Sequence, residues 1–217
     1  MDIPGVVQRL EYDPNRSAHL ALVRYPDGRQ AYILAQHGVT PGETVISSRR
    51  DALDLVPGNA MRLRFIPVGT MISCVELQIG HGPQLARAAG VACELISKES
   101  AQRQNYGLLK LTSGEIRLIH LDCLATIGSM SNPLYHIRSL GKAGKSRHMG
   151  FRPFSRGLAR NPVDHPHGGG AGKGRPGRPS ISFSGVLAKG YKTRRVRKPS
   201  PFIYTTRHRT RQLQKNE

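Results

Sequence analysis

The feature that most constrains this chain is the uneven distribution of its charge. The 217 residues carry a formal net charge of +19. Residues 1–137 hold 13 basic and 12 acidic side chains, whereas residues 138–217 hold 20 basic and only 2 acidic ones. A short basic run is usually a solvated face. Eighteen excess charges in eighty residues repel one another unless a polyanion binds them, so this sequence predicts a near-neutral folded segment followed by a polyanion-binding extension.

Nucleic acid is the polyanion that fits this extension. No apolar stretch approaches the roughly 20 residues of a membrane span, and the basic segments lack the amphipathic periodicity of a membrane-surface helix. The first thirteen residues contain neither an apolar signal core nor an Arg-rich, acid-poor leader. Either a targeting segment is removed, or the protein is made where it works. We therefore expect no membrane partner.

The three cysteines favour a reducing compartment. Cys74, Cys93 and Cys123 lie far apart and form no CxxC pair. An odd number of cysteines without metal spacing is typical of small buried side chains rather than of disulfides or a zinc site.

The neutral segment has the pattern of an all-β protein. Residues 19–25 and 29–35 flank the turn triplet Pro26-Asp27-Gly28, which predicts a hairpin. The alternating apolar residues of this hairpin predict one buried face, made by Leu20, Leu22, Tyr32 and Leu34. A short strand is expected at 44–47, followed by a polar linker over 48–60.

A second β-rich block spans residues 61 to about 127. Short runs cut by Gly, Pro or Ser predict a small barrel, with 84–89 as a helical turn or a loop. Its clearest hairpin turns at Ser113-Gly114. We expect one side of this hairpin to carry Leu109, Leu111, Ile116 and Leu118, and the other side to carry Lys110 and Arg117.

Beyond residue 137 the periodicity disappears. Gly, Pro, Ser and basic residues dominate, and too little apolar area remains to offset the entropy of ordering the chain. The expected fold class is therefore mainly β, with a long, basic, irregular C-terminal extension. A short helix is expected near 139–147.

Two glycine-rich patterns in the extension are poor evidence for nucleotide binding. Residues 172–177 (GKGRPG) match GxGxxG, but prolines and glycines stand where the flanking strand and helix are required. A Walker loop also fails, because Gly174 follows Lys173 in place of Ser or Thr. We therefore expect no nucleotide cofactor and no small-molecule substrate.

Asp164, His165 and His167 could suggest metal binding or acid–base chemistry. However, Pro162 and Pro166 force an extended or turning backbone, and no further ligand lies nearby in the sequence. No nucleophile elbow is present either. We therefore expect no enzyme and no metal site, and an enzyme built on the His165 loop is the least favoured alternative.

Recognition of folded RNA explains the same residues more simply. A glycine run lets the backbone approach phosphate closely, imidazoles can hydrogen-bond unpaired bases, and cations provide affinity through counterion release. Only 6% of residues are aromatic and none is Trp, so base stacking is not expected to be the main device. A free RNA-binding protein or RNA chaperone is the alternative class.

The string NPVDHPHGGG (161–170), with GYKTR (190–194) downstream, resembles the signature of large-subunit ribosomal protein L-two. Further matching stretches occur in the family's order, so the resemblance covers essentially the whole chain. They are RLEYDPNRSA (9–18), YILA (32–35), IPVGT (66–70), QLARAAG (84–90), SGEIRLI (113–119), ATIG (125–128) and LGKAGKSR (140–147).

The resemblance implies a partial OB-fold domain over residues 1–60, an SH3-like barrel over 61–135 and an rRNA-binding extension over 136–217. It implies a structural role in assembling the large ribosomal subunit and in supporting the peptidyl transferase region, where RNA does the chemistry. The expected partners are large-subunit rRNA and neighbouring ribosomal proteins. No cofactor is expected apart from Mg or K ions that the rRNA would hold.

The resemblance also assigns site residues. The loop near the peptidyl transferase centre maps to Asn161, Asp164, His165, His167, Gly168, Gly169 and Gly170. The expected rRNA-binding residues are Arg64, Arg87, Lys142, Lys145, Arg147, Arg152, Arg156, Arg160, Lys173, Arg175, Arg178, Lys189, Lys192, Arg194 and Arg195.

Two departures from the family pattern stand out. Family members normally carry a further segment before the EYDPNRSA motif, so another chain is expected to supply the missing strands of the first barrel. In addition, Ala171 and Phe183-Ser184 replace an acidic residue and an aromatic that bacterial-like members carry. These departures favour an organellar ribosome, with the mitochondrion ahead of the plastid.

Overall fold

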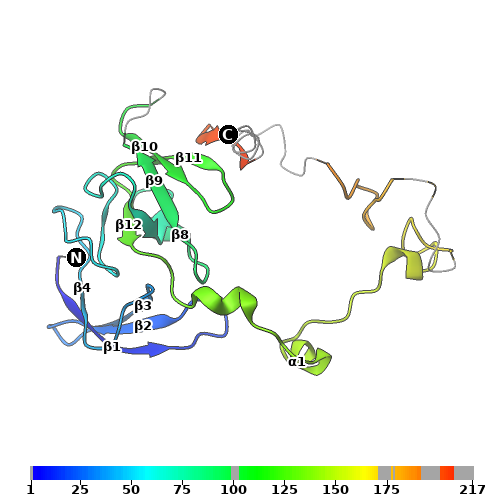
Figure 1. The fold of residues 1–217 in the computed structure, drawn as a ribbon, viewed down its shortest axis with the longest axis horizontal. Helices are drawn as coiled ribbons and strands as arrows, with labels where there is room; N and C mark the ends of the chain where they lie inside the picture. Colours follow the sequence, from blue (N-terminus) through cyan, green and yellow to red (C-terminus); the bar gives the residue numbers. More distant parts are fainter. Residues whose placement is uncertain (1, 99–102, 171–176, 178, 192–200, 208–217) are drawn as a thin grey trace. The chain divides into compact units, whose positions relative to one another are not determined.

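The structure of the chain, a computed structural model, describes residues 2–98, 103–170, 177, 179–191 and 201–207. The chain forms two compact units. The first combines Met1–Arg138 with Ser200–Glu217, and the second is Ser139–Pro199. The regular elements of the first unit are strands apart from one short 3-10 helix (Figure 1), which confirms the predicted mainly β fold class among the described residues. Among the described residues, no helix has the length and apolar character needed to span a bilayer.

The first sheet contains four strands in the order β3-β2-β1-β4. They are β1 (Gly5–Glu11), β2 (Leu20–Arg24), β3 (Gln30–Leu34) and β4 (Thr44–Val45). The hairpin of β2 and β3 confirms the strands predicted on either side of the Pro26-Asp27-Gly28 turn. Sequence analysis assigned no strand to β1, although this strand lies between β2 and β4 and pairs with both.

The buried face of this sheet differs from the predicted one. The core is formed by small side chains on the other face of the hairpin, and its members are Val7, Ala21, Val23, Ala35, Val39 and Val45. Tyr32, predicted to be buried, is 54% exposed and donates its hydroxyl to Glu11 at 3.0 Å. Leu22, on the predicted face, is buried as well, so β2 is covered on both faces. Alternation identified the two faces but could not say which one packs inward.

The second sheet contains seven strands in the order β13-β11-β10-β9-β6-β12-β5. They are β5 (Ala60–Arg62), β6 (Met71–Ser73), β9 (Cys93–Ser97), β10 (Tyr106–Lys110), β11 (Ile116–His120), β12 (Leu124–Ile127) and β13 (Ile203–Thr205). A separate pair is formed by β7 (Val75–Glu76) and β8 (Pro83–Leu85). Among the described residues, twelve buried side chains form one core here, including Met61, Ile72, Leu95 and Leu109.

The β10–β11 hairpin has a different turn from the predicted one. Leu111 and Glu115 pair across it, because Leu111 N donates to Glu115 O at 2.9 Å. The loop therefore has three residues instead of two, and its last residue, Gly114, has the positive φ of +84° that this loop type requires.

This one-residue difference moves side chains to the opposite face. Leu109 pairs with Arg117, and Lys110 pairs with Ile116. The predicted grouping of Ile116 and Leu118 with Leu109 was therefore wrong, and Ile119 joins Leu109 in the core instead.

Other local predictions had mixed outcomes. Residues 84–89 are not helical, because β8 and a loop occupy them. All three cysteines are buried and free, and burial raises the pKa of the Cys93 and Cys123 thiols to about 11. Their predicted role as small buried side chains is confirmed.

Hydrogen bonds join residues next to the first sheet to β6 and to the residues that follow β12 in the second sheet. The His19 amide donates to Ser131 Oγ at 2.9 Å, Asn132 Nδ2 donates to Ser17 O at 2.9 Å, and Ser73 Oγ donates to the buried Gln36 at 2.7 Å. These bonds satisfy polar groups that would be costly to bury alone. A short 3-10 helix, η1 (Pro133–Ile137), follows.

The unit Ser139–Pro199 has little regular structure. It contains α1 (Ala143–His148), which confirms the predicted helix, and the 3-10 turn η2 (Gly157–Ala159). In the part of this unit that the structure describes, His165 is the one buried residue. The unit therefore has no hydrophobic core of its own among these residues.

Candidate nucleic-acid interface

Helix α1 presents a cluster of cations to the solvent. Lys142, the residue before the helix, and Lys145 and Arg147 within it are all exposed, and α1 has no buried residue. The basic residues of α1 lie in its last turn, where the partial negative charge of the helix end favours them. The sequence GKAGKSR thus forms a compact exposed cationic cluster, as an anion-binding role requires.

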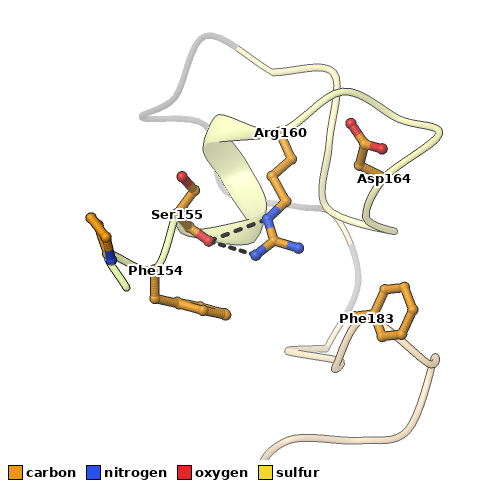
Figure 2. Close-up of a pocket in the computed structure, with 6 residues that line it drawn as sticks. Phe154, Ser155, Arg160, Asp164 and Phe183 are labelled. Carbon is orange, nitrogen blue, oxygen red and sulfur yellow. Dashed lines mark hydrogen bonds between the residues drawn. The ribbon is translucent and has the colours of Figure 1, made fainter. Parts of the chain in front are cut away.

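Two of the predicted residues, Arg160 and Asp164, line a shallow hollow in the same unit (Figure 2). The hollow measures about 480 Å³ and is lined by Pro153, Phe154, Ser155, Arg160, Asp164 and Phe183. Arg160 donates from Nε and Nη2 to the Ser155 carbonyl at 3.2 and 3.0 Å, and its guanidinium lies 5.0 Å from the centre of the Phe154 ring. Arg160 is therefore held in place, whereas Arg152 and Arg156 are exposed.

The loop over residues 161–170 is closed by its own hydrogen bonds. The Asn161 carbonyl accepts from the amides of Asp164 and His165 at 3.0 and 3.3 Å, and Gly168 N donates to His165 O at 2.8 Å. A Cβ on Gly168 would overlap the Asn161 carbonyl, so only glycine allows the backbone to pass this closely. The HPHGGG segment thus forms a compact turn, with Gly169 and Gly170 exposed.

The two histidines of this loop occupy different environments. His165 is 8% exposed, and its Nδ1 accepts from the His167 amide at 3.0 Å. The ring centroids lie 5.1 Å apart. Desolvation lowers the pKa of His165 below its ordinary value of 6.5, and the nearby His167 and Arg160 lower it further. The His165 side chain is therefore neutral at pH 7, and it helps to hold the loop through its hydrogen bond with the His167 amide. His167 Nε2 accepts from the Ile181 amide at 3.3 Å.

Asp164 does not complete a metal site with these rings. Its side chain is exposed and lines the hollow beside Arg160. Within the described ranges, no group of three or more His, Cys, Asp or Glu residues could hold a metal ion.

The remaining predicted residues fall in three places. Arg64 and Arg87 belong to the first unit, where both are exposed and Arg64 Nη2 pairs with Asp122 at 3.0 Å. Lys189 is exposed beyond the Ile181–Leu187 bridge. The other predicted cations lie outside the residues that the structure describes, and these are Lys173, Arg175, Arg178, Lys192, Arg194 and Arg195.

Sequence analysis missed one group of side chains. Arg103, Tyr106, His120 and Phe202 gather at one end of the β10–β11 hairpin in the second sheet. Tyr106 and His120 pair directly in the observed register of the β10–β11 hairpin, but the predicted register, shifted by one residue, did not bring them together. Nothing in the sequence linked Phe202 to them.

Comparison with known proteins identifies the family. Residues 56–185 match Ribosomal Proteins L2, C-terminal domain, and residues 1–47 match Ribosomal Proteins L2, RNA binding N-terminal domain. The chain belongs to the ribosomal protein L2 family. The N-terminal L2 match covers the first sheet, and the C-terminal L2 match runs from the second sheet into the unit that carries α1 and the His165 loop.

Curated L2 relatives agree along nearly the whole chain. Large ribosomal subunit protein uL2 of Rickettsia canadensis is 51% identical over 207 residues, which is 95% of this chain and 74% of the relative. The uL2 protein of Acidithiobacillus ferrooxidans is 49% identical over 209 residues, 96% of this chain and 74% of that protein. The uL2 protein of Methylorubrum extorquens is 47% identical over 208 residues, 96% of this chain and 73% of that protein. The resemblance drawn from the sequence motifs is confirmed.

Proposed function

We propose that this chain is a structural component of the large ribosomal subunit that binds large-subunit rRNA, and that the unit Ser139–Pro199 supplies its main contacts. The observation that carries the proposal is the absence of a hydrophobic core among the described residues of this unit, together with the exposed cations of α1 and the loop after it. The L2 family to which the chain belongs has an RNA-binding N-terminal domain, which agrees with this role.

Exposed apolar side chains support the same proposal. Phe154 is 84% exposed, Val163 is 90% exposed and Phe183 is 72% exposed. Such residues gain little from the fold of the unit itself, while its cations repel one another. A folded RNA compensates for both, because phosphates neutralise the cations and sugar or base surfaces cover the apolar groups.

We assign two roles within the extension. Lys142, Lys145, Arg147, Arg152 and Arg156 contact phosphate, together with the other predicted cations. The loop of Asn161, Asp164, His165, His167 and Gly168–Gly170 positions RNA near the peptidyl transferase centre. The neutral, buried His165 suits a positioning role. In this proposal the RNA performs peptide-bond chemistry, and the protein is not an enzyme.

The finer organisation is part of the proposal. We divide the chain into an OB-fold domain over 1–60, an SH3-like barrel over 61–135 and an extension over 136–217. Neighbouring ribosomal proteins are the expected protein partners. One of them could add strands to the first sheet, where β3 is an edge strand.

We place the protein in a mitochondrial ribosome, with a plastid ribosome as the alternative. Two sequence departures support this placement, namely Ala171 and the pair Phe183-Ser184. The relatives described above are proteins of bacterial large ribosomal subunits. They support a place in a large subunit, but they do not distinguish a mitochondrial ribosome from a plastid ribosome.

Quantitative mass spectrometry of gradient-purified ribosomes tests the proposal. Organellar and cytosolic particles from the source cells are separated first. We expect one copy of the protein per organellar large subunit. A second polypeptide in these particles that covers the missing N-terminal strands would identify the partner that completes the first sheet. Absence from every ribosome fraction would contradict the proposal and favour a free RNA-binding protein. Turnover of a substrate by RNA-free protein would contradict the non-enzymatic role.

A further inference from the structure

A group of aromatic and cationic side chains forms at one end of the β10–β11 hairpin in the second sheet. The Tyr106 and Phe202 rings stack with their centroids 5.8 Å apart and their planes 25° apart. The Arg103 guanidinium lies 4.7 Å from the centre of the Phe202 ring and 5.8 Å from that of Tyr106. His120 meets Tyr106 edge-on at 5.1 Å. We call Arg103, Tyr106, His120 and Phe202 the stacking cluster.

The C-terminal strand brings Phe202 to this cluster. Leu118 N donates to Phe202 O at 2.8 Å, and β13 continues alongside β11 with Arg117 paired to Ile203. Figure 1 shows β10 and β11 side by side, with the C-terminal strand at the same end of the sheet. Three separate stretches of the chain thus converge to make one small surface.

Further cations adjoin the stacking cluster. Asp122 lies 3.7 Å from His120 Nδ1, 3.0 Å from Arg64 Nη2 and 3.5 Å from Arg62 Nη1. Lys98 Nζ donates to the Arg64 carbonyl at 2.6 Å. Two arginines therefore share this single carboxylate, and the Arg64 side chain is 49% exposed. The local charge is positive beside the stacked rings.

This combination suits one kind of ligand. A guanidinium that lies over an aromatic ring presents a planar, weakly hydrated surface on which a nucleobase can stack. Base stacking on such groups does not depend on base identity, since every base has a π face. The adjacent Arg64 and Lys98 can bind the phosphate of the same nucleotide.

We propose that the stacking cluster binds one unpaired nucleotide of RNA, with its base on the Arg103–Phe202 stack and its phosphate at Arg64 and Lys98. The inference rests on the proposed rRNA-binding function and deepens it by adding a base-stacking site to phosphate contacts. This site lies in the first unit, although Phe202 comes from the C-terminal part of the extension over 136–217. Because only 6% of residues are aromatic, the sequence did not predict base stacking as the main means of RNA binding. The structure nevertheless brings two aromatic side chains, Tyr106 and Phe202, together at this site.

A fluorescence titration tests the proposal with the full chain. The probe is a ten-nucleotide single-stranded oligouridine that carries one 2-aminopurine, whose fluorescence falls when the base stacks. Wild-type protein is compared with Arg103→Lys, which keeps the charge and loses the planar group. Arg50→Lys makes the same kind of change at another exposed arginine of the first unit, outside the predicted rRNA-binding residues, and is the matched control. Arg103 is exposed, so its replacement should leave the thermal unfolding curve unchanged.

We expect Arg103→Lys to lose most of the quenching and to bind this probe about tenfold more weakly, while Arg50→Lys changes the affinity by less than about twofold. Phe202→Leu should lose the quenching as well. Wild-type quenching by Arg103→Lys would overturn the proposal, because a charge alone would then suffice. If the Arg103→Lys variant showed wild-type quenching and was also found in large subunits at the normal level, the stacking proposal would be wrong and the proposed ribosomal function would still hold. Absence of the wild-type protein from large subunits would instead refute the proposed function itself.

Discussion

The imidazole of His165 occupies the space in which a side chain at position 157 would begin. A Cβ built on Gly157 would lie 2.5 Å from both Cε1 and Nδ1 of that ring, a distance that real contacts do not reach. The turn η2 and the His165 loop are therefore fitted to each other, although seven residues separate these two positions in the chain. His165 is the buried residue of this region, and glycine at 157 makes its burial possible.

Gly157→Ala should displace His165. The added methyl group forces the ring or the turn to move, at a cost of about 1–3 kcal/mol for overpacking a filled site. We expect the NMR signals of the His165 ring protons to shift and the loop over 161–170 to become more sensitive to protease.

Gly144→Ala is the matched control for that experiment. Position 144 lies in α1, and a Cβ there meets no atom within 4 Å. Alanine also has a higher helix propensity than glycine. An equal disturbance of His165 by both variants would show that the Gly157 contact does not hold the ring.

The His165 loop should be less stable in acid. Desolvation lowers the pKa of His165 in the folded loop below 6.5, its value in an unfolded chain. A group with a depressed folded pKa contributes stability that is present above the unfolded pKa and is lost as the pH falls through the folded pKa. Protonation would also place a hydrogen on Nδ1, which now accepts from the His167 amide.

An NMR titration of the His165 ring from pH 7.5 to pH 4.5 measures this effect. We expect the midpoint below that of histidine in an unstructured peptide, with amide exchange at His167 rising over the same range. A midpoint at or above the peptide value would contradict the assignment of His165 as a neutral buried group.

Charge reversal on the α1 cluster should block assembly. Lys142→Glu, Lys145→Glu and Arg147→Glu together change the local charge by six and replace phosphate-binding groups with repelling ones. We expect recovery of the protein in large subunits to fall by roughly tenfold or more, since each lost phosphate contact also removes counterion release. The charge-preserving triple Lys142→Arg, Lys145→Arg and Arg147→Lys should assemble normally.

His165→Ala separates positioning from anchoring. We expect this variant to be incorporated into particles better than the triple reversal, because it removes no cation. Normal particle levels with the triple reversal would mean that α1 is not a main anchor. Equal losses in the two variants would mean that the His165 loop is itself an anchor.

Glu76→Gln should destabilise the first unit. The Glu76 carboxylate is 3% exposed and accepts from the amides of Leu124, Gly82 and Gly80 at 3.0, 3.2 and 3.3 Å. Glutamine keeps one acceptor oxygen and turns the other into a donor that faces these amides. We expect a loss of about 1.5–3 kcal/mol in the free energy of unfolding, measured with urea.

Glu94→Gln serves as the control for this change. Glu94 pairs with Lys110 at 3.5 Å, and both side chains are substantially exposed, so the loss should be about 0–1 kcal/mol. Equal effects of the two substitutions would show that burial of Glu76 contributes no special stability.

Much of the local structure was predictable because it depends on neighbouring residues. The triplet Pro26-Asp27-Gly28 and the alternation around it predicted β2 and β3, and a short helix was expected near 139–147, where α1 lies. The register of the second hairpin was not predictable from the same kind of pattern. A loop of two residues and one of three are both compatible with Ser113-Gly114, and this difference decides which of Ile116 and Arg117 shares a face with Leu109.

The sequence by itself determined the charge division, the mainly β class, the buried cysteines and the family, because each of these follows from composition or from contiguous motifs. Only the tertiary structure decided which face of the first sheet is buried, that His165 lies against Gly157, and that Phe202 joins Arg103 and Tyr106. These outcomes depend on contacts between residues far apart in the chain. Burial and close packing are properties of the assembled surfaces, and no local pattern encodes which surfaces will meet.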